Sequence, residues 1–176
     1  TLSCVGRSLQ PNGNRQLFFG GIMSAIETRL KALGVTLPDA PAPAANYVPF
    51  VQVGTQVYIS GQISRDASGG LITGKLGATM DVAQGADAAK TCAIALLAQL
   101  KAACGGDLDR VVRTVKLVGF VNSTAEFVDQ PKVINGASDF LVAAMGETGR
   151  HARSAISAVS LPLGVAVEIE AIFEVR

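Results

Sequence analysis

The last segment of the chain, residues 165–175, alternates between apolar side chains and a second set that is mostly acidic. Neighbouring side chains of a β-strand point to opposite faces of the sheet, so this period of two predicts a strand with one apolar face. That face carries Val165, Val167, Ile169, Ala171, Phe173 and Val175. The other face carries Ala166, Glu168, Glu170, Ile172 and Glu174. The chain is therefore expected to form a sheet whose core packs on one side, with Glu168 and Glu170 pointing away from it.

Three segments predict helices that can cover the apolar face. Residues 24–34 begin with a capping box and stop at a glycine. A longer helix starts at Asp81, which has a glutamine three positions later, and stops at the glycines 105–106. A third covers roughly residues 130–145, with a proline in its first turn. In the third helix the residues expected to face the core are Val133, Ile134, Ala137, Phe140, Leu141 and Ala144.

The remaining apolar, β-branched segments predict strands. They are residues 50–53, 56–63, 71–75, 110–121 and 153–159. With the final segment, the order of elements is ββ(β)αβαββ. This order predicts an α+β fold in which two helices lie on one face of a mixed sheet.

Three parts are expected along the chain. Residues 1–22 are rich in Gly, Asn, Gln and Arg without a sustained period, and we interpret them as a leader or extension. The alternative for them is a docking arm that covers a partner subunit. Residues 23–44 hold the first helix and a proline-rich linker. Residues 45–176 are expected to form one domain, because no second segment large enough for its own core is present.

The charges of the chain nearly cancel, with 15 basic and 14 acidic side chains and no basic block. Binding of nucleic acid through its phosphates requires a cationic surface, so a nucleic-acid partner is not favoured. No apolar run approaches the ~20 residues of a membrane span, so no membrane partner is expected.

The thiol and imidazole groups exclude several kinds of site. The three cysteines, Cys4, Cys92 and Cys104, lack metal or disulfide spacing, and the last two fall in a predicted helix as core residues. An odd number of thiols without a framework suits a reducing compartment, so we expect a cytoplasmic protein. His151 is the single histidine, which excludes a multi-histidine metal site. We interpret it as a partly exposed loop residue, with proton donation beside Arg153 as the alternative.

Arg153 opens one predicted strand, and a tight return leads from it into the strand that carries Glu168. This order brings a guanidinium and a carboxylate into one region of the sheet. Arginine binds carboxylates through paired hydrogen bonds, so the residues alone predict a candidate anion site. If the face of Glu168 closes against other subunits, burial would raise the pKa of this carboxyl group and make it useful as an acid or base.

Three motifs resemble those of the RidA/YjgF family, also called the endoribonuclease L-PSP group. They are YISGQIS at 58–64, NGASDFL at 135–141 and ARSAISAVSLPLGVAVEIEAIFEV at 152–175. The segment LPDAPAPAANYVPF, residues 37–50, is similar to that of a longer, less characterised branch. The resemblance covers about residues 45–176.

The resemblance implies a chorismate-mutase-like fold and a homotrimeric barrel with helices outside. Clefts between adjacent subunits would hold a small carboxylate-bearing ligand. Well-studied members hydrolyse the enamines and imines released by pyridoxal-phosphate enzymes to a 2-oxo acid and ammonia. The resemblance implies that neither a cofactor nor a metal is needed.

The same resemblance assigns roles to individual residues. Arg153 would bind the substrate carboxylate, and Glu168 would lie near the water or the imine nitrogen. The walls of the cleft would include Tyr47, Ser60, Gly61 and Asn135. The family often has cysteine where this chain has Ala155, whose carbonyl could still accept a hydrogen bond, although any role that needs a thiol is lost.

Three functions are open at this point. The first is a 2-imino or 2-enamino acid deaminase, and the second is a trimeric protein that binds a carboxylate without turnover. Cleavage of RNA is the weakest, because the chain is nearly neutral and has no pair of histidines.

Overall fold

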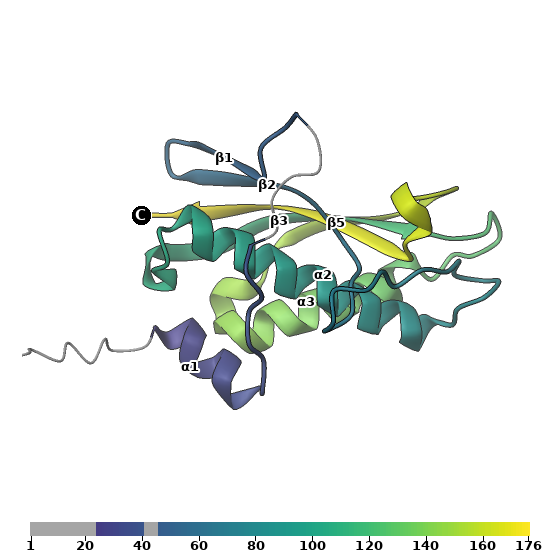
Figure 1. Ribbon diagram of the computed structural model, residues 1–176, viewed down its shortest axis with the longest axis horizontal. Helices are drawn as coiled ribbons and strands as arrows, with labels where there is room; N and C mark the ends of the chain where they lie inside the picture. The colour runs from purple at the N-terminus through teal and green to yellow at the C-terminus, as the bar shows by residue number, and fades with distance from the viewer. Residues whose placement is uncertain (1–23, 41–45) are drawn as a thin grey trace, which may run out of the picture.

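A five-stranded sheet lies at the centre of the computed structural model, which describes residues 24–40 and 46–176 (Figure 1). Its strands are β1 (Phe50–Val53), β2 (Gln56–Ile63), β3 (Val111–Asn122), β4 (Ala152–Ala158) and β5 (Val167–Val175). They lie in the order β1-β2-β5-β3-β4. β3 and β4 run parallel, and the other neighbours pair antiparallel. The sheet is therefore mixed, with β5 at its centre and β4 at one edge.

Within the described ranges, the α-helices all lie on one face of this sheet (Figure 1). They are α1 (Ala25–Ala32), α2 (Val82–Ala103) and α3 (Gln130–Met145). Short 3₁₀ turns follow at η1 (Leu108–Arg110), η2 (Gly146–Gly149) and η3 (Pro162–Gly164). The predicted α+β fold, with α2 and α3 on one face of a mixed sheet, is confirmed, and their bounds differ from the prediction by no more than two residues.

Local signals determine where the helices begin. The Gln84 N–H donates to Asp81 Oδ1 at 2.8 Å, and Gln84 Oε1 accepts from the Asp81 N–H at 3.0 Å, which completes the predicted capping box of α2. The predicted capping box of α1 forms in the same way between Ser24 and Glu27. Lys101 of α2 contacts Glu27 at 2.7 Å, so the start of α1 is tied to the neighbouring helix.

The core lies between the helices and the sheet. All six residues predicted for the apolar face of residues 165–175 are buried, as are the six core residues predicted for α3. Ile26 and Leu30 of α1 are buried in the same core. Residues 1–22, interpreted above as a leader, lie outside the described residues, as do Cys4 and residues 41–45 of the linker.

The strand predicted for residues 71–75 is wrong. Glycines flank this segment, and it makes only isolated bridges to Arg65 and Val165. The segment runs beside Val165 and Ala166, and the Ala166 N–H donates to the Ile72 carbonyl at 2.9 Å. Ala166, which the alternation placed on the open face, is fully buried in the core.

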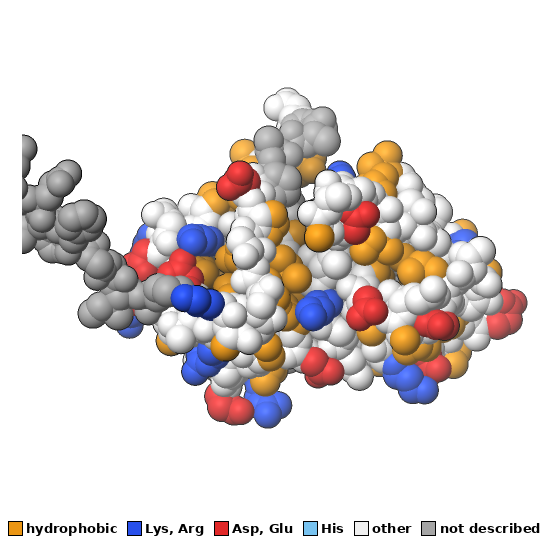
Figure 2. All heavy atoms as spheres, turned by 60° about the horizontal axis from the view of Figure 1, so that its bottom comes forward, with side chains coloured by type: hydrophobic (Ala, Val, Ile, Leu, Met, Phe, Trp, Pro, Cys, Tyr) orange, Lys and Arg blue, Asp and Glu red, His pale blue; other side chains and the backbone are white. Residues whose placement is uncertain are grey.

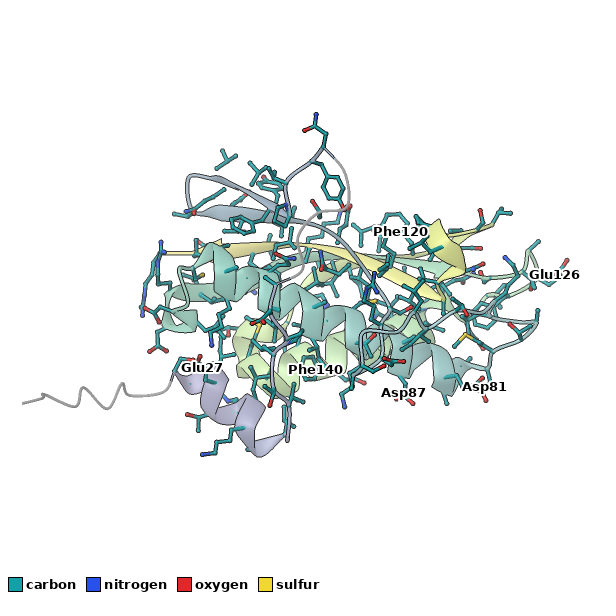
Figure 3. All side chains as sticks on the ribbon, viewed as in Figure 1. Glu27, Asp81, Asp87, Phe120, Glu126 and Phe140 are labelled. Carbon is teal, nitrogen blue, oxygen red and sulfur yellow. The ribbon has the colours of Figure 1, made fainter. Side chains whose placement is uncertain are left out.

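The face of the sheet opposite the helices carries exposed apolar side chains. Val51, Val53, Tyr58 and Ile156 are between 42% and 64% exposed. Figure 3 shows Phe120 on this face, whereas Phe140 lies among the helices. On the helical side, acidic and basic side chains are interspersed with hydrophobic ones (Figure 2). A group of exposed apolar side chains on one face of a sheet is typical of an interaction surface.

One glycine sets how closely α2 and α3 approach. A Cβ atom at Gly136 of α3 would lie 2.0 Å from the Ala86 carbonyl oxygen and 2.9 Å from the Ala86 Cα of α2. Both obstacles are backbone atoms, so they cannot turn aside as a flexible side chain could. A larger residue at this position requires the two helices to separate.

We expect Gly136→Ala to destabilise the protein by about 1–3 kcal/mol, because overpacking outweighs the gain in helix propensity. The free energy of unfolding in urea is the measurement. Ala143→Gly, at an exposed position of the same helix, reports the propensity effect alone and should lower the stability by about 1 kcal/mol. A Gly136→Ala protein more stable than wild type would contradict the close-packing argument.

Candidate functional site

Arg153 lies on the helical side of the edge strand β4. In the parallel ladder it is the partner of Leu117 in β3, and Ala155 is the partner of Gly119. Leu117 is fully buried beneath the helices, and paired residues point to the same face of a sheet. Arg153 and Ala155 therefore both face α3.

Two uncharged oxygens of α3 hold the guanidinium of Arg153. Its Nη1 donates to Ser138 Oγ at 3.0 Å, and its Nη2 donates to the Pro131 carbonyl at 3.1 Å. A guanidinium carries five N–H donors, so three remain for a ligand. No carboxylate of the described residues forms an ion pair with Arg153. The charge of Arg153 is thus oriented but not neutralised within one protomer.

Asn135 lies on the same face of α3 as the two residues that hold this guanidinium. Residues three and four apart on a helix share a face, and Asn135 follows Pro131 by four positions and precedes Ser138 by three. The two residues that hold Arg153 therefore bracket Asn135, which is exposed. We call Asn135, Ser138, His151, Arg153 and Ala155 the guanidinium cluster.

Glu168 lies on the opposite, open face of the sheet. It pairs with Phe120 of β3 and with Ile63 of β2. Burial raises the pKa of Glu168, and the neighbouring charge of Glu170 raises it further. A carboxyl group with a raised pKa can take up and release protons closer to neutral pH.

Gly61 leaves the space that Glu168 occupies. A Cβ atom at Gly61 would lie 2.1 Å from Glu168 Oε1. Gly61 is part of a β-bulge in β2, where the pairing with β5 shifts between Ile59 and Gln62. The Gln62 side chain fixes the bulge, since its Nε2 donates to the Ser60 and Gly61 carbonyls.

Ser60 connects the bulge to the segment that carries Tyr47. Its Oγ donates to the Val48 carbonyl at 2.8 Å, and its N–H donates to the Pro49 carbonyl at 2.9 Å. Tyr47 itself is 52% exposed. We call Tyr47, Ser60, Gly61 and Glu168 the carboxylate cluster.

One protomer does not bring the two clusters together. β3 separates β4 from β5, and Arg153 and Glu168 point to opposite faces of the sheet. The open face has a groove of about 360 Å³ lined by residues such as Tyr58, Val118 and Glu170. Neither that groove nor a hollow of about 530 Å³ at the start of β4 includes Arg153 or Glu168 among its lining residues.

Ser138 is a member of the site that the sequence did not reveal. Its spacing from Pro131 and Asn135 is the signal that could have found it. His151 is half-buried in the loop before β4, as the loop interpretation expects, and it too contacts Ser138, with 3.0 Å between His151 Nε2 and Ser138 Oγ. Burial lowers the pKa of His151 more than the hydrogen bond to Gly149 raises it, and the charge of Arg153 adds to the lowering.

Other chemistry finds little support in the described residues. They contain no cluster of three or more His, Cys, Asp or Glu side chains that could hold a metal ion. None of their helices combines the length and the apolar composition that crossing a membrane requires. Cys92 and Cys104 are buried, as predicted, and burial raises the pKa of each thiol, which keeps both thiols protonated.

Comparisons with known proteins agree with the fold of the chain. Residues 27–174 match a family model described as "YjgF/chorismate_mutase-like, putative endoribonuclease". Protein TCP17 of Trypanosoma cruzi is 48% identical over 152 residues, which cover 86% of this chain and 94% of that protein. The 2-iminobutanoate/2-iminopropanoate deaminase of Mus musculus is 30% identical over 139 residues, which cover 78% of this chain and 87% of the relative.

The solved structures include a protein of unknown function from Agrobacterium tumefaciens. It is 49% identical, has a TM-score of 0.81, and the match covers 86% of this chain and 93% of that one. Together with the ββαβαββ order of the domain and the mixed sheet, these matches show that the chain belongs to the RidA/YjgF family of chorismate-mutase-like proteins.

Proposed function

We propose that the protein hydrolyses small 2-imino or 2-enamino acids to a 2-oxo acid and ammonia, in clefts formed between copies of the chain. The imine tautomer is the reacting form. Water adds to the electrophilic imine carbon, a proton moves to the nitrogen, and the carbon–nitrogen bond breaks to release ammonia and leave the 2-oxo group. The single observation that carries this proposal is Arg153, a positive charge held by uncharged oxygens with three donors left for a carboxylate. The deaminase name of the mouse relative supports the choice of substrate class.

Arg153 supplies orientation. A bidentate pair between the guanidinium and the substrate carboxylate fixes the imine carbon in one place. Positioning of this kind converts the attack of water into a nearly intramolecular step. In this proposal Asn135 and the Ala155 carbonyl complete the binding of the carboxylate end.

Glu168 supplies proton transfer. In its ionised form it takes a proton from the attacking water, and in its protonated form it gives that proton to the departing nitrogen. The raised pKa of Glu168 brings the two forms closer in population near neutral pH, as this role requires. The missing side chain at Gly61 leaves room for this carboxylate.

The two clusters meet only if one copy supplies Arg153 and another supplies Glu168. The apolar side chains on the open face favour such an assembly, since they remain exposed in one protomer. We propose a homotrimer in which the open faces of the three sheets point inward and the charged helical sides face solvent (Figure 2). This arrangement would also bury Glu168 further.

A protein that binds a carboxylate without turnover is the second candidate. Ala155 favours it, because the family often has a cysteine at this position, and a methyl group cannot take part in chemistry. Cleavage of RNA remains a weaker alternative, since His151 is the single histidine and cannot form an acid–base pair with a second one. The experiments below distinguish turnover from binding.

Arg153→Ala should lower kcat/KM for 2-iminobutanoate by about 10- to 150-fold, the range expected for a lost hydrogen bond to a charged group. An amino-acid oxidase generates the imine in the assay, and the rate of 2-oxobutanoate formation is measured. Arg65→Ala, at an exposed turn, is the matched control and should behave as wild type. If the wild-type protein gives no acceleration over the uncatalysed reaction but binds 2-oxobutanoate through Arg153, the protein is a binder and not a deaminase.

Glu168→Gln should lower kcat by about 100-fold or more and leave 2-oxobutanoate binding close to wild type. In the wild-type protein, kcat should fall as the pH drops through the pKa of Glu168, which lies above the usual 4.5. Glu170→Gln should move this fall to lower pH, because Glu170 is the second cause of the raised pKa. A fall that stays at the same pH in Glu170→Gln would assign it to another group.

Coexpression of the Arg153→Ala and Glu168→Gln chains tests the assembly. If each cleft takes the two side chains from different copies, random mixing leaves about a quarter of the clefts intact, and about a quarter of the wild-type rate should return. Coexpression of Arg153→Ala with the double variant is the control and should recover nothing. Activity no higher than the sum of the two single variants would show that both side chains act from one copy.

A further inference from the structure

The guanidinium cluster contains a chain of hydrogen bonds that the proposed reaction does not yet use. It runs from His151 through Ser138 to Arg153, with 3.0 Å in each of the two steps through the serine oxygen. His151 Nδ1 lies 2.6 Å from the Gly149 carbonyl at the other end. The direction of every bond in this chain can be derived from the chemistry of its two ends.

The backbone end fixes the tautomer of His151. The Gly149 carbonyl can only accept, so His151 Nδ1 must carry the proton and donate it. In the neutral ring the other nitrogen, Nε2, then has a lone pair and no proton. Nε2 can therefore only accept, and the Ser138 hydroxyl must donate to it.

At the other end of the chain of hydrogen bonds, the Arg153 guanidinium requires Ser138 Oγ to be an acceptor. Arg153 Nη1 has only protons to offer, so Ser138 Oγ must accept from it. A hydroxyl group has one proton, and His151 directs that proton away from Arg153. Without this acceptor, the Ser138 hydroxyl could turn its proton to a carbonyl of its own helix, as serine side chains in helices often do. The imidazole thus keeps a lone pair of Ser138 pointed at the guanidinium.

We propose that His151 is a positioning residue which, through Ser138, fixes the orientation of the Arg153 guanidinium for a 2-oxo or 2-imino carboxylate. Ser138 and the Pro131 carbonyl hold different Nη nitrogens, and two such contacts determine the plane of the group. The proposal rests on the proposed function, because it assumes that Arg153 binds the carboxylate. It adds His151 and Ser138 to that site, where they increase the affinity for the ligand and do not transfer protons.

The surroundings of His151 favour the neutral ring that this arrangement needs. Burial lowers the pKa of His151 and outweighs the hydrogen bond to Gly149, which raises it, and the charge of Arg153 lowers the pKa further. The other charged groups around the ring are Arg150, which pairs with Glu147, and Arg113 and Glu174, which line the same hollow as His151. With Arg150 paired to Glu147, two arginines, Arg153 and Arg113, remain against one glutamate, Glu174, and this balance disfavours a further positive charge on the imidazole.

The test is the Kd of 2-oxobutanoate, measured by calorimetry on the full chain. Ser138→Ala should raise Kd about 5- to 10-fold, because Arg153 loses one of its two anchors. His151→Asn keeps an amide near the Nδ1 position but has no acceptor near Ser138, and it should raise Kd to a similar extent. His151→Gln places an amide oxygen near the Nε2 position and should restore affinity to within about twofold of wild type, as should Ser138→Thr, which keeps the hydroxyl.

The double variant His151→Asn/Ser138→Ala shows whether the histidine acts through the serine. Its Kd should be no higher than that of Ser138→Ala alone, because the two changes break the same chain. Multiplied effects in the double variant would overturn the proposal. So would equal losses in His151→Asn and His151→Gln.

The binding measurements distinguish failure of the positioning role of His151 from failure of the proposed function. If Arg153→Ala abolishes binding while Ser138→Ala and His151→Asn bind as wild type, only the positioning role is lost. If Arg153→Ala binds as wild type, the carboxylate site itself is wrong. A crystal structure of His151→Asn is a second measurement, in which the Arg153 guanidinium should have left Ser138, and an unmoved guanidinium would also overturn the proposal.

Discussion

The position of β5 between β2 and β3 is the constraint on which both the core and the site depend. Its alternate side chains, among them Val167 and Ile169, fill the space beneath the helices. The residues between them, including Glu168, must then lie on the open face. A slip of one residue would bury the carboxylates under α2 and expose the apolar set, so the register is strongly determined. The free energy that holds the core together therefore also determines the side from which Glu168 acts.

The parallel pairing of β3 with β4 determines the face of the sheet on which Arg153 lies. It pairs Arg153 with buried Leu117 and turns the guanidinium toward α3. The charge is then held by uncharged oxygens of the helix, which orient it without cancelling it. A protomer built in this way has an oriented cation on one side of the sheet and a carboxyl group with a raised pKa on the other. The proposed chemistry needs both groups.

Local sequence signals predicted most of the secondary structure. Capping residues such as Ser24 and Asp81 determined the helix starts, and alternation determined the faces of β5. The prediction failed where a residue's surroundings come from a distant segment. Ala166 is buried in the core and donates its N–H to the distant Ile72 carbonyl, and no pattern near Ala166 in the sequence predicts these surroundings.

The same limit applies to the candidate site. The sequence identified Arg153 and Glu168 but not the side of the sheet on which Arg153 would lie, because the parallel register is not encoded within a few residues. Ser138 was missed for this reason, since its contact with His151 spans 13 positions and its contact with Arg153 spans 15. Short spacing in the chain predicts capping well, but it does not predict contacts between a helix and a strand that follows it.

A side chain at Gly61, the glycine of the bulge in β2, would affect the Glu168 carboxylate much more than the stability of the fold. At Gly136 the obstacle to a side chain is the backbone of another helix, whereas at Gly61 it is the tip of Glu168, which is free to rotate. A methyl group at position 61 would displace the carboxylate with little loss of stability. Under the proposed function, this substitution would give a folded form that still binds the ligand and no longer converts it. Within this family, such a change would be a short evolutionary route from a catalyst to a receptor.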